Sequence, residues 1–228
     1  MRPLFTFELS ANQINGFSAG RYFLKTRINE KEINMMLAAG DCAVAPLCVV
    51  KGTDRRRNER DGFFMKCETP LKDALPNLNA DQRKAAINEM FFVMRKLHEK
   101  GIVHWDMRPD NLVICSDGRL RLIDFGNSQY ATSAVYDPEG EGPTLRYRSP
   151  KRVQMGLKYP PRKEDDYYAA GLSAYEIATD KVPFAELEDD YDEIHQAIKR
   201  GQAPDLNKIL DIGLKTQVEG WLRLGNQW

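Results

Sequence analysis

A polar stretch in the middle of the chain lies between two short apolar runs, and no other feature limits the possible fold as strongly. Residues 102–103 (Ile-Val) precede the stretch, residues 112–114 (Leu-Val-Ile) follow it, and Asp106, Arg108 and Asn111 lie between them. Short apolar runs on both sides of a polar loop predict two buried strands that hold the loop rigidly.

A second apolar run, residues 120–123, ends abruptly in the Asp-Phe-Gly sequence of residues 124–126. Two carboxylates, one amide and one cation are therefore expected at neighbouring strand ends. A single strand-end Asp is more often a turn former than a catalyst, but the combination is harder to explain in that way. Such a set of groups suits a site that binds metal ions and phosphate.

The His-x-Asp-x-Arg-Pro-x-Asn pattern of residues 104–111, followed by Asp-Phe-Gly, resembles the catalytic and metal-binding loops of the eukaryotic-type Ser/Thr protein kinases. Two separated motifs at a suitable spacing are more specific than a lone Gly-rich loop. The resemblance implies an α+β, two-lobed protein kinase-like fold, with a small, mainly β N-lobe and a larger, mainly α C-lobe. The order of predicted elements, with strands first and helices later, agrees with this fold class.

The resemblance also implies roles for individual residues. Asp106 matches the catalytic base, and Arg108 stands where Ser/Thr kinases usually have a Lys beside the transferred phosphoryl group. Asn111 and Asp124 match the two magnesium ligands. The positions implied to bind the nucleotide are Lys25, Glu32, Met65, Cys67, Asn111, Val113 and Asp124. The implied cofactors are ATP and Mg²⁺, although Lys25 taken alone has the plainer explanation of a surface lysine.

Two downstream matches favour protein kinases over small-molecule phosphotransferases. Residues 144–151 resemble the end of an activation segment, in which Thr144 occupies the position that favours Ser/Thr substrates. Asp166, followed by Gly171, resembles the start of the helix that anchors the large lobe. We expect Asp166 to accept backbone N–H bonds from the catalytic loop.

Several positions depart from the family pattern. No Gly-x-Gly-x-x-Gly precedes Lys25, and Phe23 stands where kinases have a small Ala, so the domain resembles a kinase shortened at the Gly-rich loop and at the C-terminus. Trp105 replaces the Arg that normally docks a phosphate of the activation loop, and Lys151 replaces a Glu. Switching by loop phosphorylation is therefore not expected.

Three functions remain open from the sequence. The first is ATP-dependent phosphoryl transfer to Ser/Thr hydroxyls of a protein substrate, independent of activation-loop phosphorylation, and it is favoured because all groups for metal and phosphoryl are present. The second is a pseudokinase-like protein-binding module with little or no turnover, which the missing Gly-rich loop and Phe23 favour. The third, a small-molecule kinase, is disfavoured by residues 144–150, and a truncated fragment remains a further alternative.

The bulk composition limits partners and location. The 228 residues contain 33 basic and 33 acidic side chains, so no net field favours nucleic acid or an anionic membrane. No window approaches the ~18 apolar residues of a membrane helix, and no signal peptide is recognisable. The four cysteines are scattered and predict reduced thiols. We expect a monomeric cytoplasmic protein, with the nucleus as an alternative, whose partners are ATP and a protein.

We expect one kinase domain over residues 1–228, with an N-lobe of residues 1–67 and a C-lobe of residues 68–228. Periodicity predicts strands over residues 3–9, 21–25, 44–50 and 62–67, with a polar hairpin tip over 51–60. It predicts helices over residues 30–39, 81–100, 165–179, 187–200 and 206–224. Residues 127–146 form a long connection in this prediction.

Overall fold

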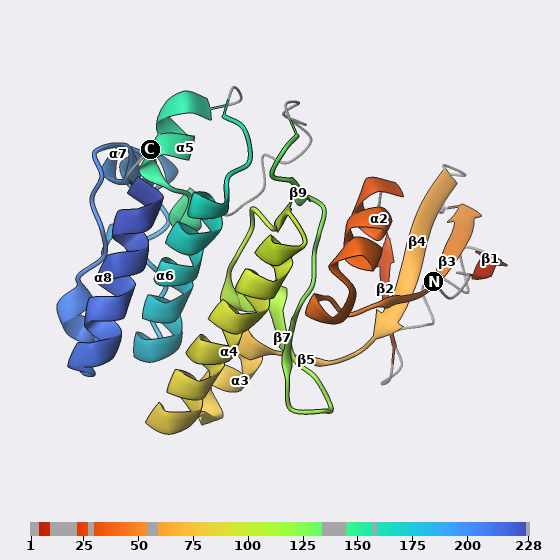
Figure 1. The fold of residues 1–228 in the computed structure, drawn as a ribbon, viewed down its shortest axis with the longest axis horizontal. Helices are drawn as coiled ribbons and strands as arrows, with labels where there is room; N and C mark the ends of the chain where they lie inside the picture. The colour runs from red at the N-terminus through yellow and green to blue at the C-terminus, as the bar shows by residue number, and fades with distance from the viewer. Residues whose placement is uncertain are drawn as a thin grey trace.

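The computed structural model describes residues 5–9, 22–26, 30–53, 59–133, 145–156 and 159–226. A small part that contains a sheet lies beside a larger helical part (Figure 1). The predicted α+β, two-lobed architecture is therefore confirmed. Within these residues, no helix is both long enough and apolar enough to cross a bilayer.

The small lobe is built on a four-stranded sheet with the order β1-β3-β4-β2. Its strands are β1 (Phe5–Leu9), β2 (Tyr22–Thr26), β3 (Pro46–Thr53) and β4 (Glu59–Lys66). β4 pairs antiparallel with both β2 and β3, whereas β1 pairs parallel with β3. The four predicted strands are all present.

The β3–β4 ribbon is longer than the sequence pattern indicated. Residues 51–60 were expected as a polar hairpin tip, but Lys51 pairs with Asp61 and Thr53 pairs with Glu59. A two-stranded ribbon can continue beyond the apolar part of a strand because its ladder is made by backbone groups, whatever the side chains are. Residues 54–58 lie outside the described residues.

Helix α2 (Glu30–Ala39) has the predicted bounds and packs against the core that both lobes share. It buries Ile33, Met36 and Ala39 against the main core. The following turn, η1 (Gly40–Cys42), leads to Val44, whose N–H donates to the carbonyl of Leu122 at 3.1 Å. The end of α2 is therefore tied directly to a strand of the large lobe.

The large lobe consists mainly of helices. They are α3 (Leu71–Ala74), α4 (Ala80–Glu99), α5 (Pro150–Met155), α6 (Lys163–Thr179), α7 (Tyr191–Lys199) and α8 (Ile212–Asn226). Short 3-10 turns lie between them: η2 (Leu75–Asn77), η5 (Leu145–Tyr147), η7 (Ala185–Leu187) and η8 (Leu206–Lys208). In Figure 1, α4, α6 and α8 lie side by side.

The ends of α4 follow from local chemistry. The Asn79 side chain accepts from the Gln82 N–H, and the Gln82 side chain accepts from the Asn79 N–H, which makes a reciprocal capping box. At the other end, Gly101 has a φ of 74°, a backbone conformation that glycine adopts without a steric penalty. The predicted helix over residues 81–100 is confirmed within one residue.

The last helix begins later than predicted. Residues 206–224 were expected to be helical, but residues 206–208 form only the turn η8, and α8 starts at Ile212. The carboxylate of Asp211 accepts from the Leu214 N–H at 2.8 Å, so this side chain caps the helix start and fixes the boundary. Leu210, which lies within the predicted helix span, is 93% exposed.

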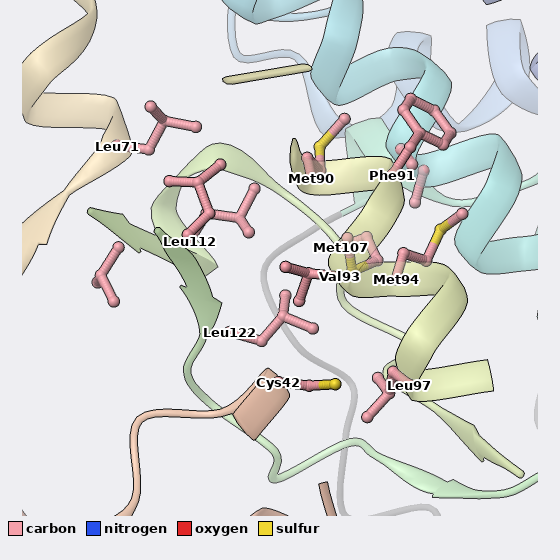
Figure 2. Close-up of a cluster of buried hydrophobic side chains, with 14 of the residues drawn as sticks. Cys42, Leu71, Met90, Phe91, Val93, Met94, Leu97, Met107, Leu112 and Leu122 are labelled. Carbon is pink, nitrogen blue, oxygen red and sulfur yellow. The ribbon is translucent and has the colours of Figure 1, made fainter. Parts of the chain in front are cut away.

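One apolar core extends through both lobes. It includes Met36 and Phe63 from the small lobe and Leu122 from the large lobe. Figure 2 shows Val93 and Leu97 of α4 facing Leu122, with Cys42 beside them and Met107 close to Val93. The loop that bears the candidate catalytic residues is therefore anchored in the core through Met107, which is fully buried.

Candidate active site

Short strands hold the loop of residues 104–111 at both ends. The loop follows β6 (Ile102–Val103), which pairs with β9 (Gln129–Tyr130), and it ends in the turn η3 (Pro109–Asn111). β7 (Leu112–Ile114) then pairs antiparallel with β8 (Leu120–Leu122). The two buried strands expected around the polar stretch are thus present, and residues 124–126 follow directly after β8.

Asp106 and Asn111 are joined across the loop. The Asn111 amide nitrogen donates to both the backbone oxygen and the Oδ2 atom of Asp106, each at 2.9 Å. Asn111 is buried, and its carbonyl accepts from the Ile123 N–H at 3.0 Å. These bonds fix the Asp106 carboxylate from the downstream side and bring Asn111 next to the residue that precedes Asp124.

Asp166, at the start of α6, holds the upstream half of the loop. Its carboxylate accepts from the backbone N–H groups of His104 at 2.8 Å and Trp105 at 2.7 Å. The ring Nε2 of His98, on α4, lies 2.8 Å from the same carboxylate. All three bonds are buried, so the expectation that Asp166 accepts backbone bonds from this loop is confirmed.

His104 and Phe125 contribute packing at this site. Their rings are arranged edge to face with centroids 4.9 Å apart, and both side chains are fully buried. His104 Nε2 lies 3.1 Å from the carbonyl of Ile123, and the Ser128 hydroxyl donates to the carbonyl of His104 at 3.1 Å. The loop of residues 104–111 and the segment after β8 therefore form one rigid unit.

Lys25 bridges two carboxylates that are far apart in sequence. Its ammonium group lies 2.5 Å from Glu32 Oε1, on α2, and 2.8 Å from Asp124 Oδ1. The side chain of Glu32 is 4% exposed, whereas that of Asp124 is 47% exposed. The structure thus brings together three predicted site residues, and the lysine is not a simple surface residue.

Burial and pairing act on the protonation of this triad in opposite directions. Burial lowers the pKa of Lys25, but Asp124 and Glu32 outweigh it, so the pKa lies above its ordinary value. Burial raises the pKa of Glu32 above its ordinary value, although Lys25 opposes this shift. Burial also disfavours the charged form of Asp124, but the Lys25 ammonium dominates and lowers its pKa. Asp124 is therefore ionised at neutral pH.

The donor set fits a magnesium ion. Because Asn111 uses its amide nitrogen to bond Asp106, its side-chain oxygen is oriented as an acceptor, and Asp124 supplies an ionised carboxylate. Hard oxygen ligands of this kind suit Mg²⁺ that is bound together with phosphate. The described residues contain no group of three or more His, Cys, Asp or Glu that could bind a metal alone. One carboxylate and one amide, completed by substrate oxygens, remain consistent with that finding.

The other predicted site residues occupy different environments. Met65 and Val113 are buried, at the end of β4 and in β7, whereas Cys67 is exposed between β4 and β5 (Thr69–Pro70). Arg108 is partly buried, with its Nε 3.8 Å from Asp110. Phe23 is 51% exposed and pairs with Met65 across β2 and β4. Thr144 lies outside the described residues.

Sequence reasoning missed a buried cluster between α3, η5 and α6. Glu176 is completely buried and accepts from the Lys72 ammonium and the Tyr147 hydroxyl. Burial and the neighbouring Glu176 carboxylate both raise the pKa of Tyr147 well above its ordinary value. The partners are separated by up to 104 residues, so no local pattern could reveal them.

A second missed cluster joins Trp105 to helices α5 and α6. Arg152, on α5, donates from Nη1 to the carbonyl of Trp105 at 2.8 Å, and its guanidinium lies 4.1 Å from the Trp105 ring centroid. Ser149 donates to Asp165 at 2.5 Å. Burial raises the pKa of Asp165 to about 6, although Ser149, Arg152 and Trp105 oppose that shift. The only sequence signal was the basic pair Lys151 and Arg152 at a helix start, where cations are unfavourable.

The comparison with protein families agrees with this geometry. The model of the protein kinase domain matches residues 63–221, which is more than half of the chain. The chain belongs to the protein kinase family. The matched region contains the whole loop of residues 104–111, the Asp-Phe-Gly segment and helix α6, but not Lys25 or Glu32.

Curated kinases from distant organisms are similar to part of this kinase-family chain. A probable serine/threonine-protein kinase of Dictyostelium discoideum is 31% identical over 119 residues, which cover 52% of the chain and 22% of that protein. A probable cAMP-dependent protein kinase catalytic subunit of Encephalitozoon cuniculi is 34% identical over 101 residues, or 42% of the chain and 28% of that protein. A probable serine/threonine-protein kinase of Corynebacterium glutamicum is 30% identical over 118 residues, which cover 50% of the chain and 18% of that protein. The matched part thus spans less than a third of each relative.

Proposed function

We propose that this chain transfers the γ-phosphoryl group of ATP to Ser or Thr hydroxyls of a protein substrate, with Mg²⁺ as cofactor. The observation that supports this most strongly is the bridge from Lys25 to Glu32 and Asp124, at 2.5 and 2.8 Å. A buried glutamate on α2 and an ionised carboxylate after β8 hold one ammonium group at the junction of the two lobes. The names of the similar proteins, which are probable serine/threonine kinases, support the same substrate class.

In the proposed reaction, Asp106 accepts the proton of the substrate hydroxyl while the hydroxyl oxygen attacks the γ-phosphorus. A new oxygen–phosphorus bond forms, the bond to the bridging oxygen breaks, and ADP leaves with that electron pair. Asn111 holds the Asp106 carboxylate in place through its amide nitrogen. Arg108 supplies a permanent positive charge beside the transferred group.

Mg²⁺, bound by Asn111 and Asp124 together with phosphate oxygens, would neutralise phosphate charge during the transfer. Lys25 would contact the phosphates directly, and Glu32 would orient the Lys25 ammonium. Met65, Cys67 and Val113 would line the adenine side of the nucleotide. Each of these assignments is implied by the resemblance described above.

We further propose that transfer does not depend on phosphorylation of the segment after β9. Trp105 stands at the position where a phosphate-binding cation would be needed, and its backbone N–H and carbonyl are already bonded by Asp166 and Arg152. The catalytic loop therefore has its bonds in place without a phosphate group.

The decisive experiment combines nucleotide binding with transfer. Purified protein is titrated with ATP, with and without Mg²⁺, in a thermal-shift assay, and transfer from radiolabelled ATP to a degenerate Ser/Thr peptide library is measured. Ligand at ~100 times its dissociation constant stabilises a fold by about 2.7 kcal/mol, which the assay detects easily. We expect a magnesium-dependent rise in Tm and measurable transfer.

Two variants test nucleotide binding and phosphoryl transfer separately. Asp124→Ala should abolish magnesium-dependent binding, whereas Asp106→Asn should still bind ATP but transfer no phosphate. Asp117→Asn, an exposed carboxylate in the turn between β7 and β8, is the matched control and should behave as wild type. If both site variants transfer phosphate like the parent, the assignment of the site is wrong.

The alternative function is a protein-binding module without turnover. Phe23 favours it, because a half-exposed aromatic side chain replaces the small residue expected beside adenine. The same titration distinguishes the two functions, since this module should show no magnesium-dependent rise at millimolar ATP.

A further inference from the structure

Trp105 has an unusual backbone conformation immediately before Asp106. Its φ is 65°, in the left-handed region, where a bulky side chain is strained. Strain of this kind persists only where neighbouring groups enforce it. Asp166 accepts from the Trp105 N–H at 2.7 Å, which fixes the upstream side of the residue.

Arg152 enforces the other side of Trp105. Its Nη1 donates to the Trp105 carbonyl at 2.8 Å, and its guanidinium lies over the Trp105 ring, 4.1 Å from the centroid. One side chain thus binds both the backbone and the ring of the same residue. Stacking on an aromatic face combined with a hydrogen bond in the guanidinium plane is specific to Arg among the basic residues.

The bonded carbonyl belongs to the peptide unit that leads into Asp106. Since a peptide unit is planar, fixing the direction of the Trp105 carbonyl also fixes the direction of the Asp106 N–H. Asn111 fixes the same aspartate from the other side, at its carbonyl and its carboxylate. Asp106 is therefore held between a contact from α5 upstream and a contact from η3 downstream.

The position of Arg152 is itself well determined. Its backbone N–H donates at 3.2 Å to the Ser149 hydroxyl, which caps α5 and in turn bonds Asp165 on α6. Arg152 and Asp106 also line the same small cavity. Helices α5 and α6 thus support the guanidinium beside the loop.

We propose that Arg152 is a positioning residue for Asp106: it holds the catalytic loop in its strained, transfer-competent conformation through Trp105. The proposal rests on the proposed kinase function and specifies how the loop is fixed without a phosphate. Because a guanidinium stays charged at every physiological pH, this contact is permanent.

The test compares Arg152→Ala, Arg152→Gln and Arg152→Lys with wild type in the peptide-library transfer assay. The two variants that lose the cation should reduce kcat at least tenfold and change the KM for ATP by less than twofold, because Lys25 and Asp124 lie elsewhere. Arg152→Lys, which keeps a charged donor but not the planar stack, should recover part of the rate. Gln154→Ala is the matched control, since Gln154 lies on the same helix and donates to the Lys199 carbonyl at 2.9 Å.

A spectroscopic readout reports the contact directly. The chain has three tryptophans, so a Trp221→Phe, Trp228→Phe background leaves Trp105 as the only indole. In this background, Arg152→Ala should shift the emission spectrum of Trp105, with the far-UV circular dichroism unchanged. Gln154→Ala should leave the emission spectrum as it is.

Each outcome has a definite meaning. If wild type transfers phosphate and folded Arg152→Ala retains its kcat, the positioning role is wrong while the proposed function stands. An equal loss of kcat in Gln154→Ala would show that Arg152 has only a general structural role in α5, which would overturn the inference. If wild type neither binds Mg-ATP nor transfers phosphate, the proposed function fails, and the positioning role fails with it.

Discussion

The two sides of the candidate active site are held in different ways. The catalytic loop is fixed by side chains from α4, α5 and α6, among them the fully buried carboxylate of Asp166. The side proposed to bind the nucleotide is held by Lys25, which bridges Glu32 and the half-exposed Asp124. The first arrangement is part of the hydrophobic core, whereas the second is an ion-pair bridge between lobes. Substitution of the buried Asp166 should therefore affect folding, whereas substitution of Lys25 should affect ligand binding and transfer.

The largest expected effect tests the catalytic side. Asp166→Ala leaves the N–H groups of His104 and Trp105 buried without their acceptor, which should cost about 3–5 kcal/mol of folding free energy. Urea unfolding measures the loss. Asp180→Asn, which removes a half-exposed charge just after the same helix and keeps a side chain tolerated at the left-handed backbone there (φ 57°), should cost less than about 1 kcal/mol. Equal costs for the two variants would contradict the structural role assigned to the buried Asp166 carboxylate.

The next effect tests the nucleotide side. Lys25→Met should lower the transfer rate by about 10²- to 10³-fold, as expected when one preorganised cation is lost from a transition state. Steady-state transfer kinetics and urea unfolding of the same protein separate the loss of rate from any loss of fold. Lys66→Met, which removes a half-exposed lysine from the neighbouring strand β4, is the control and should retain the rate. An active Lys25→Met protein would contradict the role proposed for the bridge.

A third prediction concerns the pH dependence of folding stability on the catalytic side. Asp165 has an ordinary pKa of 3.8 that burial raises to about 6, so the folded state binds this proton more tightly than the unfolded state. The group favours folding at low pH, and its contribution is lost as the pH rises from about 4 to about 6. Two pKa units correspond to about 3 kcal/mol.

Urea unfolding at pH 4 and pH 7.5 checks that loss. Relative to wild type, Asp165→Asn should become more stable by about 3 kcal/mol between the two pH values. Glu164→Gln, in the same helical turn but less buried, controls for the loss of a charge. A pH-independent difference between Asp165→Asn and wild type would show that the carboxyl titrates normally in the folded protein.

The smallest single effect is expected for Phe23, which contrasts with a second aromatic residue of the small lobe, Phe63. Phe23 is 51% exposed, so Phe23→Ala should cost less than about 1 kcal/mol of stability. Phe63 lies on the neighbouring strand and is fully buried in the shared core. Phe63→Ala should therefore lower the free energy of unfolding by about 3–5 kcal/mol. Thermal and urea unfolding measure both. Similar costs would mean that β2 is buried more deeply than the described contacts indicate.

Much of this arrangement could be predicted from local patterns. The apolar runs around residues 104–111 predicted the strands that hold the loop, and the spacing of apolar residues predicted α2, α4 and α6 closely. The motifs also predicted the contact between Asp166 and the catalytic loop. These features depend on neighbouring residues or on motifs that span a few positions.

The features that could not be predicted depend on pairs that are distant in sequence. Arg152 meets Trp105 across 47 residues, and Lys72 meets Glu176 across 104. Asp165 illustrates a second reason, because an acidic residue in the first turn of a helix is expected on the surface, where it favours the dipole. Its burial depends on how α5 and the catalytic loop pack against α6. The prediction placed the start of α8 too early, because the apolar residues 209–210 extend the helical pattern upstream of the capping residue Asp211.

The carboxylate of Asp166 has a consequence for the way this molecule unfolds. It joins residues that are 61 to 68 positions away, so the catalytic loop reaches its shape only when α6 has docked against α4. In the wild-type protein, release of the upstream half of the loop from Asp166 should therefore accompany the separation of α6 from α4. The Lys25 bridge is less enclosed, because the Asp124 side chain is half-exposed. A shift of α2 that separates Glu32 from Lys25 would nevertheless also move Ile33 and Met36, which lie in the core that both lobes share.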